Sequence, residues 1–309
     1  MDFLFDPDHY GEERDALFQS SDSLGNSPLS QRLLVLVGDE PWAQDVVAHA
    51  LHRAMRTAAE VHFLSILTTQ LVWGMSDVMA ASVLDVSVFT AQGQYELAWA
   101  AAAAEEADVP YTTSLRWGNI PATIRYTVKT ARCALIVMGP YMRIGCEPLS
   151  GRYLARRVAV NVGQPVLVVP QSLTATGKNM AWQRVLVVID GATAIDDVME
   201  HVCMVAAQEE RVTLCFLQVT PPRGQAATRA RAACTFAAAQ AAAAGVAYEV
   251  HHATGDMAAA ILKTAATQQC DVVMLGIPAR NVWSRFWRGC PTTTLLDRIT
   301  LPMLLIPSA

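Results

Sequence analysis

Short apolar runs alternate with longer helix-forming segments along almost the whole chain. The runs lie at 33–37, 61–67, 111–116, 134–138 and Pro165–Val169, and again at 185–189, 212–219, 247–252, 271–275 and Pro302–Ile306. Apart from 111–116 and 247–252, which mix polar and apolar residues, they are mostly apolar at successive positions, which is typical of strands that helices cover on both faces. Strands of this kind alternating with helices predict βαβ units and a parallel sheet.

The helices expected between these strands fall into two sets of the same order. They lie at 42–58, about 91–107 and about 150–162, and at 194–208, about 226–244 and about 291–299. One further helix of each set is opened by Gly118-Asn119 or by Gly255-Asp256. Alanine, the best helix former, dominates the second helix of each set.

The order recurs because the sequence repeats itself. Gly118 to Pro170 can be laid over Gly255 to Pro307 at a constant offset, with no gap. The identical pairs include Gly118 with Gly255, Ile124 with Ile261, Cys133 with Cys270, Gly139 with Gly276, Arg143 with Arg280, and Pro165 with Pro302. Earlier positions match at a different offset, which places an insertion in the first half, at Thr68 to Ala91.

Two tandem doubly wound α/β domains, each with a five-stranded parallel sheet, are therefore expected. A polar extension covers 1–30, domain 1 covers 31–170, a linker covers 171–181, and domain 2 covers 182–309. Such sheets bind ligands outside the carboxyl ends of their strands, at the point where the strand order reverses.

Composition narrows the function classes. The chain is 52% hydrophobic and 17% charged, which argues against disorder. Its net charge of −5 offers no bulk attraction to nucleic acid. Neither a signal peptide nor a membrane-inserted span is expected. The seven cysteines include no C-x-x-C pair and suit a reducing compartment, so the cytoplasm is the expected location.

Several motifs, taken in order and in duplicate, resemble a tandem member of the universal stress protein family over about residues 31–309. They are RVLVVIDGA from Arg184, GD-x-x-x-x-I from Gly255, DVVMLG from Asp271 with Arg280 four residues on, and the closing strands QPVLVVP and LPMLLIP. The resemblance implies a Rossmann-like fold and a role in stress response.

Nucleotide-binding members of that family carry G-x-x-G, nine residues, then G-S or G-T after the fourth strand, where backbone N–H groups approach phosphates. In domain 2 the resemblance implies a degenerate adenine-nucleotide site, with ATP as its ligand, at Asp190, Gly191, Gly276, Ala279, Arg280, Gly289 and Cys290. In domain 1, Met142 and Arg152 stand at glycine positions, so no ATP is expected there. The alternative is a loop that the fold requires and that kept two turn glycines.

A second candidate is an interaction patch in which guanidinium groups lie among aromatic rings. It comprises Trp283, Arg285, Phe286, Trp287 and Arg288. Such composition marks contact with a protein partner, while packing of the loop on its own domain is the competing interpretation.

Catalytic and metal sites are not expected. His251 and His252 point to opposite faces of a strand, and no further ligand is visible near them in the sequence. His49 and His201 occupy equivalent helix positions and are expected to pack or to face solvent. No combination of nucleophile, base and orienting group can be assembled.

The expected function is thus a non-enzymatic regulator or scaffold with a degenerate nucleotide site in domain 2. An ATP or cyclic-nucleotide sensor and a slow nucleotide hydrolase are the alternatives. The two domains are expected to pair within the chain through Pro165–Val169 and Pro302–Ile306, which would protect both sheet edges, and further oligomerisation stays open.

Overall fold

The computed structural model describes the strands and helices of both domains. It covers residues 32–38, 42–67, 86–140, 154–170, 180–191, 193–209, 211–220, 225–277 and 300–307, with the backbone at 143–144 and 147–148 and the positions 295 and 298. The N-terminal extension, residues 68–85 of the insertion, residues 171–179 of the linker and most of the helix expected at 291–299 lie outside the described residues.

Domain 1 follows the predicted order of elements. They are β1 (Arg32–Leu36), α1 (Ala43–Thr57), β2 (Glu60–Leu67), α3 (Val86–Glu106), β3 (Tyr111–Trp117), α4 (Ile120–Ala131), β4 (Cys133–Met138), α5 (Leu154–Val162) and β7 (Val166–Val168). Between β4 and α5 lies an antiparallel ribbon of β5 (Arg143–Ile144) and β6 (Glu147–Pro148), which the hydrophobic pattern did not predict.

Domain 2 repeats the order without the ribbon among its described residues. Its elements are β8 (Arg184–Ile189), α6 (Ile195–Gln208), β9 (Thr213–Thr220), α7 (Gln225–Ala243), β10 (Ala247–Thr254), α8 (Met257–Thr267), β11 (Val272–Ile277) and β12 (Met303–Pro307). The predicted α/β class with five parallel strands per domain is confirmed.

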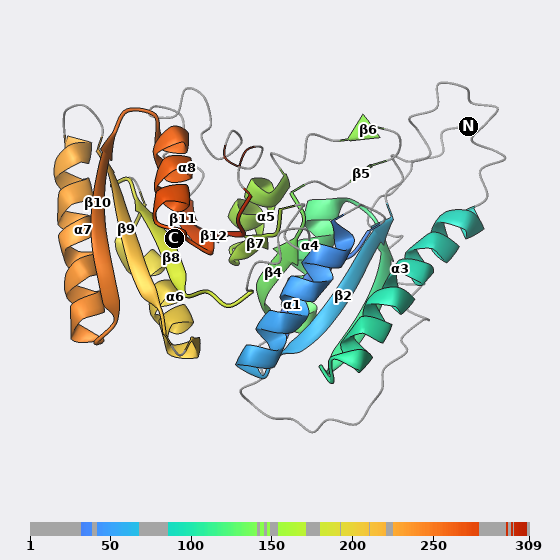
Figure 1. Cartoon of the computed structure of the whole chain (residues 1–309). Coiled ribbons are helices and arrows are strands. Elements are labelled where there is room, and N and C mark those ends of the chain that lie inside the picture. The colour runs from blue at the N-terminus through green and yellow to red at the C-terminus, as the bar shows by residue number, and fades with distance from the viewer. Residues whose placement is uncertain are drawn as a thin grey trace, which may run out of the picture.

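All these strands except the short ribbon form one ten-stranded sheet, in the order β10-β9-β8-β11-β12-β7-β4-β1-β2-β3. Pairs within each domain are parallel, and the domains join through the antiparallel pair of β7 and β12. Figure 1 shows the two halves side by side, with β7 and β12 adjacent in the middle. Leu167 and Leu304 are direct partners at this junction, and both are buried.

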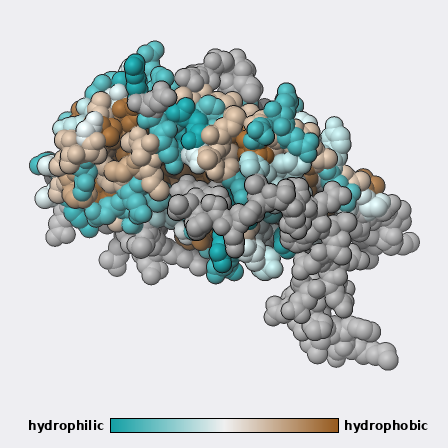
Figure 2. Space-filling model, turned by 90° about the horizontal axis from the view of Figure 1, so that it is seen from below, coloured by the Kyte–Doolittle hydropathy of each residue, from teal (hydrophilic) through white to brown (hydrophobic). Residues whose placement is uncertain are grey.

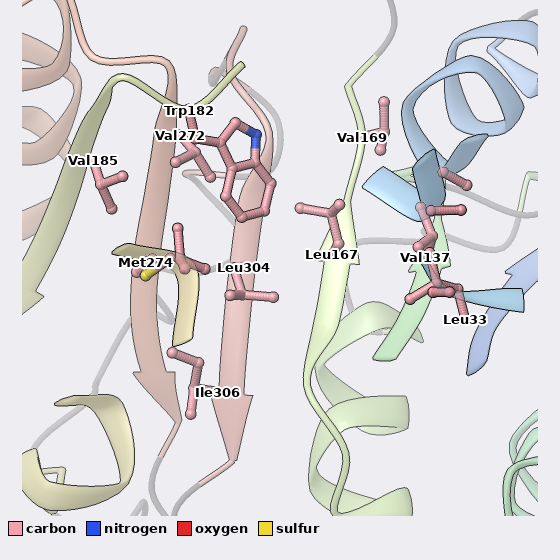
Figure 3. Close-up of a cluster of buried hydrophobic side chains, with 14 of the residues drawn as sticks. Leu33, Val137, Leu167, Val169, Trp182, Val185, Val272, Met274, Leu304 and Ile306 are labelled. Atoms are coloured by element: carbon pink, nitrogen blue, oxygen red, sulfur yellow. The ribbon is translucent and has the colours of Figure 1, made fainter. Parts of the chain in front are cut away.

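Helices cover both faces of the sheet, so the molecule has three layers. One core lies under α1, α3, α6 and α7, and the other lies under α4, α5 and α8. Successive strand residues alternate between the two, as Val187 and Val188 do. Because each core runs across both domains, the junction is continuous packing; Figure 3 shows Leu33, Val137, Leu167 and Leu304 in one of them.

A buried polar cluster also joins the domains. In α1, the Arg53 guanidinium donates to Glu209 Oε1 at 2.5 Å and to Gln208 Oε1 at 2.8 Å, both at the end of α6. Its Cζ atom lies 4.1 Å from the centre of the Trp182 ring, and the His49 ring lies 6.5 Å from the same indole. The side chains of Arg53 and Glu209 are 5% and 3% exposed.

The two helices opened by glycine dipeptides begin as the sequence predicts. Gly255 has φ +95°, and the Asp256 side chain then accepts from the backbone N–H of Ala259 at 2.8 Å. Asn119 caps α4 in the same way, accepting from Ala122 at 3.3 Å. Both side chains satisfy a backbone donor that the helix itself leaves unpaired.

Loss of the α8 cap gives a small and specific effect. We expect Asp256→Ala to lower the free energy of unfolding by about 1 kcal/mol, because the N–H of Ala259 loses its acceptor. Asp256→Asn keeps an acceptor oxygen and should lose less. Urea titration of both variants tests this, and equal losses would contradict the capping role.

Candidate functional site

The switch point of domain 2 lies between β8 and β11, which are neighbours although β9 and β10 intervene in the sequence. Asp190 directly follows β8, and Gly276 lies near the end of β11. Thr193 joins them: its backbone N–H donates to Asp190 Oδ1 at 3.3 Å, and its hydroxyl donates to the Gly276 carbonyl at 3.3 Å. Gly191 has φ +72°, a conformation that favours glycine.

Gly276 leaves no room for a side chain. A Cβ atom built on it would lie 2.3 Å from Thr193 Cγ2 and 2.9 Å from Val198 Cγ2. The glycine predicted from the phosphate-loop pattern is therefore also needed for the loop after β8 to pack on β11. The close approach of a ligand and the packing of this loop would each require glycine at this position.

Three of the predicted site residues thus meet at one end of the sheet: Asp190, Gly191 and Gly276. The others, Ala279, Arg280, Gly289 and Cys290, lie outside the described residues, as does the whole interaction patch from Trp283 to Arg288. Thr193, which bonds to both Asp190 and Gly276, was missed because a threonine in a loop carries no signal without its partners.

The switch point of domain 1 lies between β1 and β4, and a tryptophan side chain packs there. Gly139 follows β4, and a Cβ atom there would lie 2.1 Å from Cδ1 and Nε1 of the Trp42 indole. Trp42 is the N-cap residue of α1 and is only 9% exposed. It corresponds to Ala194, the N-cap residue of α6, so a large ring in one domain replaces a methyl group in the other.

The sequence could have indicated this substitution. With Arg32 laid on Arg184, Trp42 falls on Ala194, three residues after Gly191 of the predicted site. Met142 and Arg152, the residues expected to obstruct phosphate in domain 1, lie outside the described side chains. Trp42 is thus the described feature that distinguishes the two switch points most clearly.

No helix in the described part of the chain is both long and apolar enough to cross a bilayer. Figure 2 shows hydrophilic side chains interspersed with apolar ones over the face that it presents.

Comparison with known proteins agrees with the repeat. The model of the universal stress protein family matches residues 30–170 and 181–307. A universal stress protein from Archaeoglobus fulgidus superposes with a TM-score of 0.65 at 14% identity, covering 90% of this chain and 96% of that one. A functionally unknown protein from Pseudomonas aeruginosa gives 0.58 at 17% identity, with 90% and 93% covered. No curated protein sequence matches.

Proposed function

Because the chain belongs to the universal stress protein family in both of its halves, we propose that it is a non-enzymatic stress-response protein that acts by binding. Domain 2 holds a degenerate adenine-nucleotide site, and domain 1 binds no nucleotide. One observation carries the proposal: an indole fills the switch point of domain 1, while a threonine and an alanine stand at that of domain 2.

The argument for domain 1 is steric. An adenosine approaching the ends of β1 and β4 would have to displace Trp42, which is almost fully buried. Moving it would return an aromatic side chain to water, at a cost of about 1.5–3 kcal/mol. Domain 1 therefore contributes the fold and the junction with domain 2.

The argument for domain 2 is chemical. Asp190 provides a carboxylate at the end of β8, where a ribose hydroxyl could donate to it. Gly276 lies in β11 just before the segment whose backbone N–H groups would approach phosphates, and Arg280, four residues on in the sequence, supplies a positive charge. Cys290 in place of serine and Pro291 in place of an N–H donor weaken the site, which makes it degenerate.

Nucleotide released by denaturing natively purified protein, identified by mass spectrometry, is the direct test. Bound ATP or cyclic AMP would make domain 2 a sensor. Empty protein with no thermal shift would leave a scaffold, since ligand at 100 times its Kd adds about 2.7 kcal/mol of stability. ATP turnover that falls in Asp190→Asn would favour the hydrolase alternative.

The substitution Ala194→Trp gives the switch point of domain 2 the indole ring that fills the switch point of domain 1. We expect it to weaken ATP binding by about 100-fold or more, because the ring clashes with the bound nucleotide. Met204→Trp, on the exposed surface of α6, is the matched control and should bind as the wild type does. Calorimetric titration measures both, and equal affinity in Ala194→Trp would place any nucleotide elsewhere.

The partner of the scaffold is proposed to be a protein that contacts the segment from Trp283 to Arg288. Aromatic rings and guanidinium groups are enriched at such contacts. Replacing Trp283, Phe286 and Trp287 with serine should release a partner captured from stressed cells while leaving the unfolding transition in place. Retention of the partner would redirect the search to another surface.

A further inference from the structure

Three potential metal ligands from two neighbouring strands converge at the amino-terminal half of the domain 2 sheet, away from the switch point. Cys215 of β9 and Glu249 of β10 are direct partners across the pair, and His251 lies two residues beyond Glu249. The Cys215 sulfur, a Glu249 oxygen and a His251 nitrogen all lie within 4.8 Å of one another. The Glu249 Oε2 and His251 Nε2 atoms are 3.3 Å apart.

One thiol, one imidazole and one carboxylate are thus gathered from two strands. Cys270, in the turn between α8 and β11, belongs to the same buried core as Cys215 but not to this group of ligand atoms. From this arrangement we propose that Cys215, Glu249 and His251 form a zinc-binding site, with the fourth position of the metal open to water.

The spacing fits the metal. Zinc binds nitrogen at about 2.0–2.1 Å and carboxylate oxygen at about 2.0–2.2 Å, mostly with tetrahedral geometry. Two such ligands are then about 3.4 Å apart, close to the separation of Glu249 Oε2 and His251 Nε2. The Glu249 and His251 side chains are 43% and 26% exposed. Their exposure gives an ion a path from solvent to the buried thiol of Cys215.

A cation already lies among these donors. The Arg184 Nη2 atom is 3.4 Å from Cys215 Sγ and 3.0 Å from Glu249 Oε2. Arg184 is also held by the Gln268 carbonyl, which accepts from its Nε atom at 2.7 Å. Zinc would displace the Nη2 end of the guanidinium and leave that second bond in place, so Arg184 competes with the metal.

Domain 1 has the same geometry with different chemistry. His62 stands at the register position of Cys215, and its ring nitrogens contact Thr112 Oγ1 at 2.7 Å and Ser114 Oγ at 2.8 Å. Thr112 and Ser114 correspond to Glu249 and His251. An imidazole replaces the thiol, and two hydroxyl groups replace the carboxylate and the imidazole of domain 2, so domain 1 serves as the internal control.

Cobalt is the spectroscopic probe for this site, and zinc is the competitor. The reduced full-length protein should bind one cobalt ion with thiolate-to-cobalt absorption, and zinc should abolish that absorption. Cys215→Ser should remove the thiolate band. Arg184→Gln should bind cobalt about ten-fold more tightly, because a competing positive charge is gone.

The controls separate this site from other thiols. His62→Gln, and serine at each of the other six of the seven cysteines, should leave the absorption unchanged. No cobalt uptake by the reduced protein, or a band that persists in Cys215→Ser, would overturn the proposal. Arg184→Gln keeps the test decisive if a cysteine variant fails to fold, since unchanged or weaker cobalt affinity in it also contradicts the site.

Discussion

Glu209→Ala should lower the free energy of unfolding by about 3–5 kcal/mol, because it leaves the buried Arg53 guanidinium without its counter-charge. Burial already lowers the pKa of Arg53, and Glu209 opposes that shift through charge and a hydrogen bond. The Gln208 amide oxygen and the Trp182 ring remain beside Arg53 in the variant, but neither carries a negative charge. Urea unfolding of the variant and the wild type measures the difference.

The Arg32–Glu60 pair provides the matched control. Its side chains are 31% and 23% exposed, so Glu60→Ala should cost only about 1 kcal/mol or less. The double variant Arg53→Met with Glu209→Leu should recover most of the stability, since apolar residues of similar volume replace a buried pair well. A loss in Glu209→Ala no larger than that in Glu60→Ala would show that the cluster does not hold the domains together.

The strands were the most predictable part of the structure. A strand buried on both faces is apolar at every position, as Leu33 to Val37 and Val185 to Ile189 are. The hydrophobic pattern of the sequence therefore predicts such a strand directly. Ends were less certain: α3 begins at Val86, ahead of the expected start near residue 91. Val88 and Thr90 have low helix propensity, yet they continue the alanine-rich helix.

The contacts between domains could not be predicted, because they depend on the antiparallel junction. Arg53 in an amphipathic helix has the sequence pattern of an ordinary solvated charge, and its partners Trp182 and Glu209 lie in the other half of the chain. The same holds for Cys215 and Glu249, which meet only through strand pairing. Residues that lie far apart in the sequence give no indication that they meet in the fold. The hydrophobic pattern predicts only the strands and helices that carry them.

The repeat places equivalent backbones together but assigns them different chemistry. Trp42 corresponds to Ala194 at the switch points, and Arg53 corresponds to Val205 in the helices that begin there. His62 corresponds to Cys215 in the sheet. The two domains have therefore diverged at the switch point, at a contact between the domains and at the proposed zinc site, as the proposed division of roles requires.

Acidification from pH 7.5 to pH 5 should destabilise the protein through two buried histidines. The pKa of His62 is lowered to about 4, mainly by burial and then by Arg32 and Arg116. The pKa of His49 is also lowered to about 4, mainly by burial and then by His52 and Arg53, against an opposing effect of Asp45. Both rings are thus neutral in the folded state at pH 5, whereas in the unfolded chain they are protonated below about pH 6.5.

The unfolded state then binds more protons, so this contribution is complete above about pH 6.5 and is lost as the pH falls toward 4. Each histidine accounts for about 2 kcal/mol at pH 5. In His62→Gln or His49→Gln, the difference in unfolding free energy between pH 7.5 and pH 5 should shrink by that amount, whatever the stability of the variant at neutral pH. Urea titrations at both pH values measure it. A variant with the wild-type difference would mean that its histidine is protonated in the folded protein, and that the domain interface or the sheet tolerates the charge.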